Sequence, residues 1–315
     1  MKTYNDLQKL SLADSVLSIG NFDGVHLGHQ SIIQNLSFAA KQAAVESVLI
    51  TFQPHTRFFL QKDLKHHLIC SLEQKMRIFE GFGIDHVLIL PFNKEMAATK
   101  AKDFLEQVQK QIHFSKLFLG STASLGSDRQ SKTLDKIAED LKFQMHRVES
   151  RLVGEQRISS SLARQMLQKG QFKNLEKILA RPYSVLGKIT NGNNRAQALG
   201  FPTANMSLNT LCLPPFGVYT VHVEHMNKTY HGIANLGMAP TFNKAREPLL
   251  EVHLIDFNQK IYGQELEVFF DQYIRPEQKF QSKDALIDQI FNDIEKARLI
   301  FKRKKRTTKL ALSTL

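Results

Sequence analysis

Short apolar runs recur through the first half of the chain, at spacings long enough to hold a helix between them. These runs cover residues 16–19, 48–52, 87–90, 117–119 and 143–148. Between two of them, Ser71 and Gln74 have the spacing of a capping box, and Gly81 lies where the helix that follows would stop. The alternation of strand and helix predicts an α/β fold with a doubly wound parallel sheet, in which ligands bind beyond the carboxyl ends of the strands.

The pattern changes near residue 181, where short runs separated by turn residues replace the longer spacing. The new runs cover residues 185–189, 218–223, 231–236, 249–257 and 266–270. Such short strands with frequent turns predict a compact antiparallel β-barrel. After Ser282 one helix face carries apolar residues at Leu286, Ile287, Ile290, Phe291 and Ile294. We expect this helix to close the barrel.

The chain has 315 residues, 42% of them hydrophobic, which suits two domains with separate cores. We expect domains at 1–180 and 181–301, followed by a basic tail at 302–315. No apolar run is long enough to cross a membrane, and the first twelve residues lack the pattern of a signal peptide. These features predict a cytoplasmic protein without a membrane partner. Cys70 and Cys212 have no partner at metal-ligand spacing, which predicts neither a disulfide framework nor a zinc site.

The formal charge of +12 raises the question of a polyanion partner. Six positive charges lie in the tail, where no acidic residue follows Glu295: Lys302, Arg303, Lys304, Lys305, Arg306 and Lys309. We interpret this run as a solvated or disordered chain end. Binding of nucleotide phosphates explains part of the remaining positive charge, so we do not expect nucleic acid as a partner.

Two histidines and three glycines follow the first apolar run, within the decamer from Gly20 to His29. In the first turn of a helix, His26 and His29 share a face above unpaired backbone N–H groups, which attract anions. Gly28 has no Cβ and lets a triphosphate approach the backbone. These groups predict nucleotidyl transfer, in which pre-placed donors stabilise charge on phosphoryl oxygens. For an isolated pair of histidines, a surface position without a role is the simpler interpretation.

The whole decamer resembles the GxFDGxHxGH signature of bacterial FAD synthetases, nucleotidyltransferase-like enzymes that adenylylate FMN. The resemblance implies a Rossmann-like domain in which His26 and His29 are catalytic. It also implies that the nucleotide is bound by the other motif residues, Gly20, Asn21, Phe22, Asp23, Gly24 and Gly28.

Two further segments resemble the same synthetases. Residues 157–164 resemble their ISSTxxR segment, and residues 51–55 resemble their TFxPHP segment. Without the resemblance, the serines are ordinary helix caps and His55 is a loop residue without a role. With it, the nucleotide site includes Ser159, Ser160, Ser161 and Arg164, and the flavin site includes Phe52, Pro54 and His55.

A second group of candidate residues lies in the barrel half. Thr203 and Asn205 offer two neutral oxygen ligands, which suit Mg²⁺ because the ion can keep its waters and take further ligands from ATP. Strand alternation places Glu251 and His253 on the face opposite Val252, and a carboxylate is a suitable base for phosphorylating a hydroxyl. Taken singly, a glutamate facing solvent and a Thr-Ala-Asn tripeptide in a loop carry little information.

Together, the segments of this half resemble riboflavin kinase. They are Gly187, residues 200–205, 216–219, 232–237, 250–257 and 274–280. The resemblance implies that Glu251 accepts the proton of the ribityl 5′-hydroxyl and that Thr203 and Asn205 hold Mg-ATP. It further implies a nucleotide site with Gly187, Arg195, Gly200 and Pro202, and it places Arg275 near the flavin.

Two segments depart from the family patterns. Between Gly120 and Gly126 the synthetases carry an acid and two aromatic residues, whereas this chain has Thr122, Ala123 and Leu125, and Ser131-Lys132 replaces a Gly-Asp pair. Around Arg195 the chain has asparagines in place of a glycine-richer loop, a milder change because asparagine tolerates left-handed geometry.

Three interpretations follow. The first is a bifunctional enzyme that converts riboflavin to FMN and FMN to FAD, using ATP and Mg²⁺ in each half. The second is a riboflavin kinase with a weakened adenylyltransferase domain, suggested by the altered loop from Gly120 to Lys132. The third is a basic nucleic-acid-binding or regulatory protein on the same fold, suggested by the charge alone. The sequence leaves the oligomeric state open.

Overall fold

A computed structural model describes the chain except for residues 61–66, 128–130, 191–202, 209, 227, 241–245, 258, 260 and 313–315. The chain folds as two units, each treated separately below. The first contains residues 1–163 and 178–180, and the second contains residues 164–177 and 181–315. None of the helices that the structure describes combines the length and the apolar composition needed to cross a bilayer.

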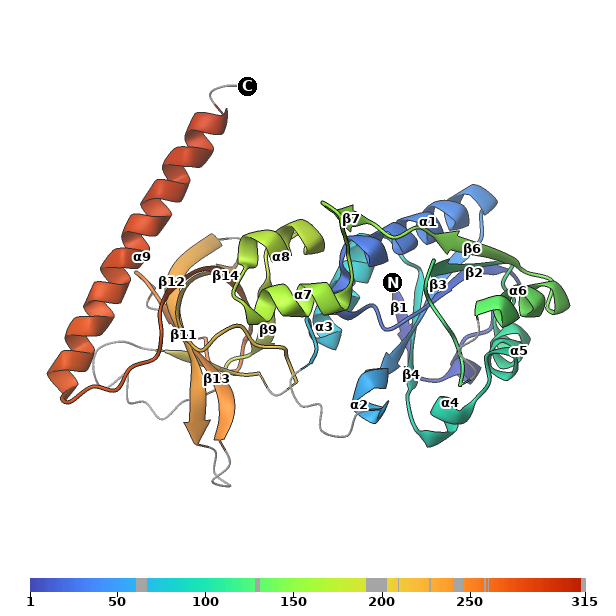
Figure 1. Ribbon diagram of the computed structural model, residues 1–315, viewed down its shortest axis with the longest axis horizontal. Coiled ribbons are helices and arrows are strands. Elements are labelled where there is room, and N and C mark those ends of the chain that lie inside the picture. The colour runs from blue at the N-terminus through green and yellow to red at the C-terminus, as the bar shows by residue number, and fades with distance from the viewer. Residues whose placement is uncertain are drawn as a thin grey trace. The chain divides into compact units, whose positions relative to one another are not determined.

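A parallel sheet forms the centre of the first unit (Figure 1). Its strands are β1 Lys2–Tyr4, β2 Ser15–Ile19, β3 Glu46–Gln53, β4 His86–Pro91, β5 Lys116–Gly120 and β6 Gln144–Val148. The strand order β1-β4-β3-β2-β5-β6 confirms the predicted doubly wound sheet. The sequence pattern did not predict β1, because its three residues at the sheet edge are too short to show an alternation.

Helices cover both faces of this sheet. They are α1 Leu27–Ala43, α2 Thr56–Leu60, α3 Leu72–Gly81, α4 Lys94–Ala98, α5 Ala101–Gln111 and α6 Ser131–Asp140, with short 3-10 turns η1 Leu7–Lys9 and η2 Asp23–Val25. The capping box at Ser71 and Gln74 is present with both of its hydrogen bonds, and α3 ends at Gly81 as predicted. The unit also holds a small hairpin of β7 Leu152–Val153 and β8 Gln156–Arg157.

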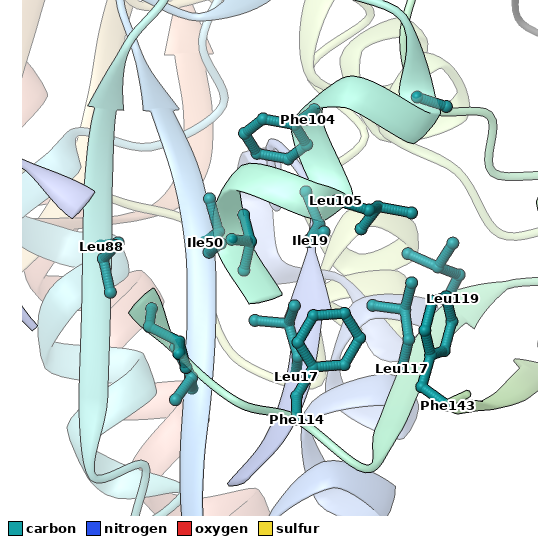
Figure 2. Packing of buried hydrophobic residues seen from close by; sticks show 14 of the residues in the cluster. Leu17, Ile19, Ile50, Leu88, Phe104, Leu105, Phe114, Leu117, Leu119 and Phe143 are labelled. Atoms are coloured by element: carbon teal, nitrogen blue, oxygen red, sulfur yellow. The ribbon is translucent and has the colours of Figure 1, made fainter. Parts of the chain in front are cut away.

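Alternate residues of the strands enter two separate cores. On one face, Leu17, Ile50 and Leu117 pack against α5, where Phe104 and Leu105 are almost fully buried (Figure 2). On the other face, the neighbouring strand residues pack against α1 and α3. Each fully buried leucine or phenylalanine contributes about 1.5–3 kcal/mol. The second core also includes part of the β2–α1 connection, so the candidate site rests on a rigid base.

The second unit is built on an antiparallel sheet. Its strands are β9 Ser184–Lys188, β10 Ala204–Ser207, β11 Gly217–His225, β12 Lys228–Pro240, β13 Arg246–Leu254 and β14 Glu265–Arg275, in the order β10-β13-β12-β11-β14-β9. The first and last strands of this order are joined by an isolated bridge, in which Thr190 N donates to Asn205 O at 2.9 Å. The bridge closes the sheet and confirms the predicted barrel.

Three helices complete the description: α7 Ser160–Gln168, α8 Phe172–Leu179 and α9 Lys283–Leu312. Phe172 packs with Tyr183, Tyr219 and Phe270 within the barrel. The closing helix is confirmed as α9, which packs on the other face of the barrel sheet through Ile294, Ala297 and Phe301, and through Ile287 and Ile290 beside them.

Two details of the closing helix differ from the sequence prediction. Phe291 was assigned to the packed face but is 55% exposed, because it lies one residue beyond the stripe formed by Ile287, Ile290 and Ile294. The chain end from residue 302 was interpreted as solvated or disordered. Its backbone is helical rather than disordered and continues α9 as far as Leu312 (Figure 1).

Candidate functional site

The connection between β2 and α1 has an unusual backbone. Phe22 and Val25 adopt left-handed conformations, with φ of 49° and 37°, and Gly24 has φ of 74°. A Cβ on Gly24 would lie 2.9 Å from the side chain of Ile69, so glycine is required by both conformation and space. Left-handed conformations of bulky residues cost about 1–3 kcal/mol each and cluster at functional sites.

The two motif histidines stack against each other. His26 is the N-cap of α1 rather than a residue of its first turn, and its Nδ1 accepts the backbone N–H of His29 at 3.3 Å. The ring centroids are 3.7 Å apart and the rings are inclined by 16°. A Cβ on Gly28 would lie 3.2 Å from the His26 ring, so the space beside this glycine accommodates the imidazole. The structure thus brings the predicted pair together.

Burial and neighbouring cations act together on His29. Although part of this residue is exposed, its Nδ1 is buried and has no hydrogen-bond partner among the described residues. Burial, followed by the charges of His26, Lys75 and His55, holds the pKa of His29 well below its ordinary value of 6.5. The imidazole is therefore neutral at pH 7, with one buried ring nitrogen available to a ligand.

A second helix begins beside this connection. Ser159 Oγ accepts the backbone N–H of Leu162 at 3.2 Å, so it caps α7. Ser160 Oγ donates to the carbonyl of Asp23 at 3.0 Å and joins the start of α7 to η2. The N-termini of α1 and α7 thus lie close together, and both favour negative charge. Of the remaining predicted residues, Ser161 is exposed and Arg164, one turn along α7, is buried.

The other motif residues at the carboxyl edge of the sheet have structural partners. Asn21 Nδ2 donates to Thr56 Oγ1 at 2.9 Å, and a carboxylate oxygen of Asp23 accepts the Ile69 N–H at 2.9 Å. Gly20 lies beside the ring of Phe22, which also contacts the edge of His29 at a centroid distance of 5.4 Å. These contacts connect the motif to α1, to α2 and to Ile69 in the segment before α3.

The predicted flavin segment follows β3, next to β2 in the sheet. His55 is buried, and its Nδ1 accepts the Arg57 N–H at 3.1 Å. The peptide bond between Gln53 and Pro54 is cis. Phe52 packs with Phe92 and Phe104 in the sheet core, which is the environment of a structural residue. Within this segment, His55 acts electrostatically on His29 and helps to lower its pKa.

Sequence reasoning missed Lys75, whose side chain contacts the motif at Asn21. Its side chain is 6% exposed, and its Nζ donates to the carbonyl of Asn21 at 3.1 Å. A lysine in the first turn of an amphipathic helix has the sequence signature of a solvent-facing residue, so no pattern marks it. Its importance is visible only from the contacts that α3 makes with the β2–α1 connection.

The altered loop after β5 makes its own contacts. Thr122 Oγ1 accepts a hydrogen bond from Arg157, and Ser121 Oγ lies 3.1 Å from Ser150 Oγ. Ala123 and Leu125 pack against the sheet core. Thr122, Ala123 and Leu125, which replace the family's acid and aromatic residues, therefore make contacts with other residues of this protein. Residues 128–130 lie outside the described part of the chain.

In the second unit, three polar residues form a row across adjacent strands. Glu251 of β13 lies opposite Asn205 of β10 on one side and opposite Asn235 of β12 on the other. Asn235 Nδ2 donates to Glu251 Oε2 at 3.5 Å. Residues directly opposite each other in an antiparallel pair share a face, while Val252 next to Glu251 is buried on the other face. Asn235 lies in a motif segment, but no role was assigned to it from sequence.

The row contains an unsatisfied amide oxygen. Asn205 is 4% exposed, and its Oδ1 has no hydrogen-bond partner in the described part of the chain. Thr203, half-buried, lies two residues before it. Gly187 on β9 leaves room for Met206, since a Cβ there would lie 2.8 Å from Met206 Cγ. Three further predicted nucleotide residues lie outside the described residues: Arg195, Gly200 and Pro202.

Arg275, predicted near the flavin, forms a buried ion pair. Its Nη2 lies 2.8 Å from Asp293 Oδ2, and its Nε donates to the same oxygen at 2.9 Å. Asp293 is 1% exposed and also accepts from Gln289 at 2.9 Å. In register, Arg275 lies opposite Val218, which in turn lies opposite Asn235. The ion pair therefore fixes α9 beside the polar row.

Two family models match the chain in separate segments. The model described as FAD synthetase matches residues 8–162, and the model described as riboflavin kinase matches residues 179–301. Among curated proteins, the bifunctional riboflavin kinase/FMN adenylyltransferase of Haemophilus influenzae is 36% identical over 295 residues, covering 92% of this chain and 95% of that protein. The protein of the same name from Bacillus subtilis is 34% identical over 297 residues, covering 92% and 94%.

A solved structure supports the same fold. A crystal structure from Streptococcus pneumoniae, described as a macrolide-efflux protein, matches with a TM-score of 0.80 and 29% sequence identity. The match covers 94% of this chain and 98% of that chain. The similarity therefore extends over both units.

Proposed function

We propose an assignment of residues to reactions from one premise: this chain belongs to the family of bifunctional riboflavin kinase/FMN adenylyltransferases. It phosphorylates riboflavin to FMN and adenylylates FMN to FAD, with ATP as the second substrate of each reaction. The first reaction is assigned to the row around Glu251, and the second to the stacked histidines.

We assign adenylyl transfer to a domain of residues 1–180 and riboflavin phosphorylation to residues 181–301, with residues 302–315 outside both. The riboflavin kinase model matches from residue 179, two residues before the proposed boundary, and the FAD synthetase model matches up to residue 162. Residues 164–177 associate with the second unit, so the boundary of the compact unit lies somewhat earlier than that of the proposed domain.

In adenylyl transfer, an FMN phosphate oxygen attacks the α-phosphorus of ATP, and the bond to the leaving pyrophosphate breaks. Negative charge grows on the phosphoryl oxygens, and donors that are already in place stabilise it without reorganising. His26, His29 and the N-termini of α1 and α7 are placed to supply these donors. The observation that carries this assignment is the stacked pair, in which the buried Nδ1 of His29 has no hydrogen-bond partner within the described part of the chain.

Within the same site, we propose that Gly20, Asn21, Phe22, Asp23, Gly24 and Gly28 shape the nucleotide pocket. Ser160, Ser161 and Arg164 extend it along α7, and Ser159 acts through its cap. Pro54 and His55 contribute to the flavin side. Phe52 supports that segment from the core, as its packing against Phe92 and Phe104 indicates.

In riboflavin phosphorylation, Glu251 accepts the proton of the ribityl 5′-hydroxyl as that oxygen attacks the γ-phosphorus of ATP, and the bond from this phosphorus to the leaving ADP breaks. The amide of Asn235 donates to Glu251 Oε2 and orients the carboxylate. Arg275 and its partner Asp293 hold α9 beside this base. Gly187, Arg195, Gly200 and Pro202 are assigned to the nucleotide of this reaction by resemblance.

The donor set at β10 fits Mg²⁺. Asn205 Oδ1 is buried and lacks a partner among the described residues, and the hydroxyl of Thr203 is a second neutral oxygen ligand. When bound, the ion would neutralise negative charge on the ATP phosphates. Asn205 and Thr203 would hold it, and Glu251 across the strand pair would keep its role as the base.

Substitutions at the two sites test the assignment. Purified variants are incubated with ATP and Mg²⁺ and with either riboflavin or FMN, and the flavins are separated by chromatography. We expect His29→Ala to abolish FAD formation while FMN formation from riboflavin continues. Glu251→Gln should abolish FMN formation and leave adenylylation of supplied FMN intact. Loss of both activities in either variant would contradict the division between sites.

The altered loop favours a quantitative alternative, in which adenylylation is much slower than phosphorylation. The supporting observation is that Thr122 and its neighbours bind Arg157 and the sheet core, whereas the family carries an acid and aromatic groups there. Comparing the two turnover numbers in one preparation decides between them. Equal rates would exclude the alternative.

A further inference from the structure

Lys75 is a buried cation that neither reaction scheme yet uses. It lies in the first part of α3, with 6% of its surface exposed. A lysine side chain is rarely so deeply buried without a specific partner. Its hydrogen-bond acceptors are two neutral oxygens, the carbonyl of Asn21 at 3.1 Å and Thr51 Oγ1 at 3.5 Å.

These two contacts tie the ammonium group to the carboxyl edge of the sheet. Thr51 is a fully buried residue of β3, and its hydroxyl also donates to the carbonyl of Asn21 at 3.3 Å. The same carbonyl therefore receives donors from β3 and from α3. It directly precedes the left-handed residue Phe22, so the network fixes the point at which the strained connection begins.

Lys75 also acts electrostatically on His29. Burial lowers the pKa of Lys75, while the nearby Cys70 and Asp23 oppose that effect. The groups that act electrostatically on His29 are His26 on its own helix, Lys75 on α3 and His55 after β3. Replacing Lys75 by a neutral residue therefore removes one of the three neighbouring titratable groups that lower the pKa of His29.

We infer that Lys75 is a positioning residue for adenylyl transfer: its ammonium group anchors the Asn21 carbonyl and keeps a positive charge near His29. This inference rests on the adenylylation site proposed above. Lys75 acts through the connection it holds and through His29. A misplacement of about 1 Å at a reacting centre costs about a hundredfold in rate, so a loosened connection has a large effect.

If Lys75 anchors the connection, its substitution should affect the stability of the protein and the rate of FAD formation differently. Burying an ammonium group that has only neutral acceptors costs free energy, and an apolar side chain of similar volume avoids this cost. Lys75→Met should therefore keep or raise the melting temperature while slowing FAD formation. A merely structural lysine would instead lose stability and activity together.

The experiment uses the full chain and three variants: Lys75→Met, Thr51→Val and Lys41→Met. Thr51→Val removes one acceptor of Lys75 and one donor to Asn21 with little change in volume. Lys41→Met removes an exposed lysine from α1 and serves as the control. For each variant we measure kcat and KM for FMN and ATP in FAD formation, riboflavin phosphorylation, the melting temperature and the NMR titration of the His29 ring.

We expect Lys75→Met to lower kcat for FAD formation by about a hundredfold, with riboflavin phosphorylation unchanged. Thr51→Val should lower it by about tenfold. The His29 titration should move to higher pH in Lys75→Met and stay in place in Lys41→Met. FAD formation within threefold of wild type in Lys75→Met, or an unmoved His29 titration, would overturn the inference. If Lys75→Met does not fold, Thr51→Val decides: activity within twofold of wild type would overturn it.

A failure of the underlying site proposal gives a different result. If His29→Ala adenylylates FMN at the wild-type rate, the site itself is wrong, whatever Lys75 does. If His29→Ala is inactive and Lys75→Met is fully active, the site stands and the role of Lys75 is refuted.

Discussion

Glu251 lies directly opposite Asn205 across the β10–β13 pair, so its carboxylate shares one face of the barrel sheet with a buried amide oxygen that has no hydrogen-bond partner among the described residues. This arrangement provides separate groups for the two proposed functions, proton acceptance and cation binding, which would otherwise compete for one acidic group. The carboxylate is left to accept a proton, while the neutral amide remains available to a cation.

The first prediction concerns the proposed base. Glu251→Gln should lower kcat for riboflavin phosphorylation by about 10²–10⁴-fold, because the amide cannot accept the proton of the attacking hydroxyl. Its adenylylation of FMN should be unchanged. Glu247→Gln, an exposed position four residues earlier on the same strand, is the matched control. A Glu251→Gln enzyme within threefold of wild type would rule out Glu251 as the base.

The second prediction concerns the proposed Mg²⁺ ligand. Asn205→Ala should raise the Mg²⁺ concentration that gives half-maximal phosphorylation by about tenfold or more, because the ion loses one oxygen ligand. The rate is measured as a function of free Mg²⁺. The Mg²⁺ dependence of FAD formation by the same variant provides the internal control and should not move. Equal shifts in both reactions would argue against a local ligand role.

The third prediction uses the proton affinity of His29. Because its pKa in the folded protein is lowered below the ordinary 6.5, the unfolded chain binds a proton more readily than the folded chain as the pH falls below about 6.5. The contribution of His29 to stability is therefore present at pH 7.5 and is lost towards pH 5.5. The free energy of unfolding should fall more steeply over this range in wild type than in His29→Gln. Identical slopes would show that His29 titrates normally.

The fourth prediction concerns the ion pair that joins β14 to α9. Asp293→Ala should destabilise the second unit by about 3 kcal/mol in urea unfolding, because it leaves the charge of Arg275 partly buried without its partner. The double variant Arg275→Met/Asp293→Leu should recover most of this loss. Asp256→Asn, which disrupts the exposed pair with Arg298, should change stability little. A comparable loss in both single variants would contradict the importance of burial.

The fifth prediction tests the crowding behind the histidine pair. Gly28→Ala would place a Cβ 3.2 Å from the His26 ring, so the ring must shift and FAD formation should slow by about tenfold or more. At Gly81, the last residue of α3, a Cβ would meet no atom within 4 Å. Gly81→Ala should therefore leave the activity intact. Similar rates for the two variants would show that His26 has room to move.

The sequence predicted well where local pattern and local structure coincide. Five strands of the parallel sheet, the capping box at Ser71 and the alternation around Glu251 follow from short-range rules. The pairing of His26 with His29 also follows from helix spacing, although His26 turned out to be the cap. Phe291 was misplaced because an apolar residue next to a stripe cannot be distinguished from a member of it by composition.

The residues that escaped prediction are defined by contacts between distant segments. Lys75 and the carbonyl of Asn21 are 54 residues apart, and no periodicity relates them. Asn235 meets Glu251 only because β12 and β13 pair in one register. The same limit applies to the ion pair of Arg275 with Asp293, since a motif marks the arginine but not its partner.

The bridge that closes the barrel involves Asn205, a residue that is also assigned to the proposed kinase site. Asn205 accepts the Thr190 N–H through its backbone carbonyl, and its side-chain oxygen is the proposed ligand of the cation. The β10–β13 pairing sets Asn205 opposite Glu251, and the bridge ties the same residue to Thr190, which follows β9. The closure of the barrel sheet and the proposed cation site therefore depend on the same residue.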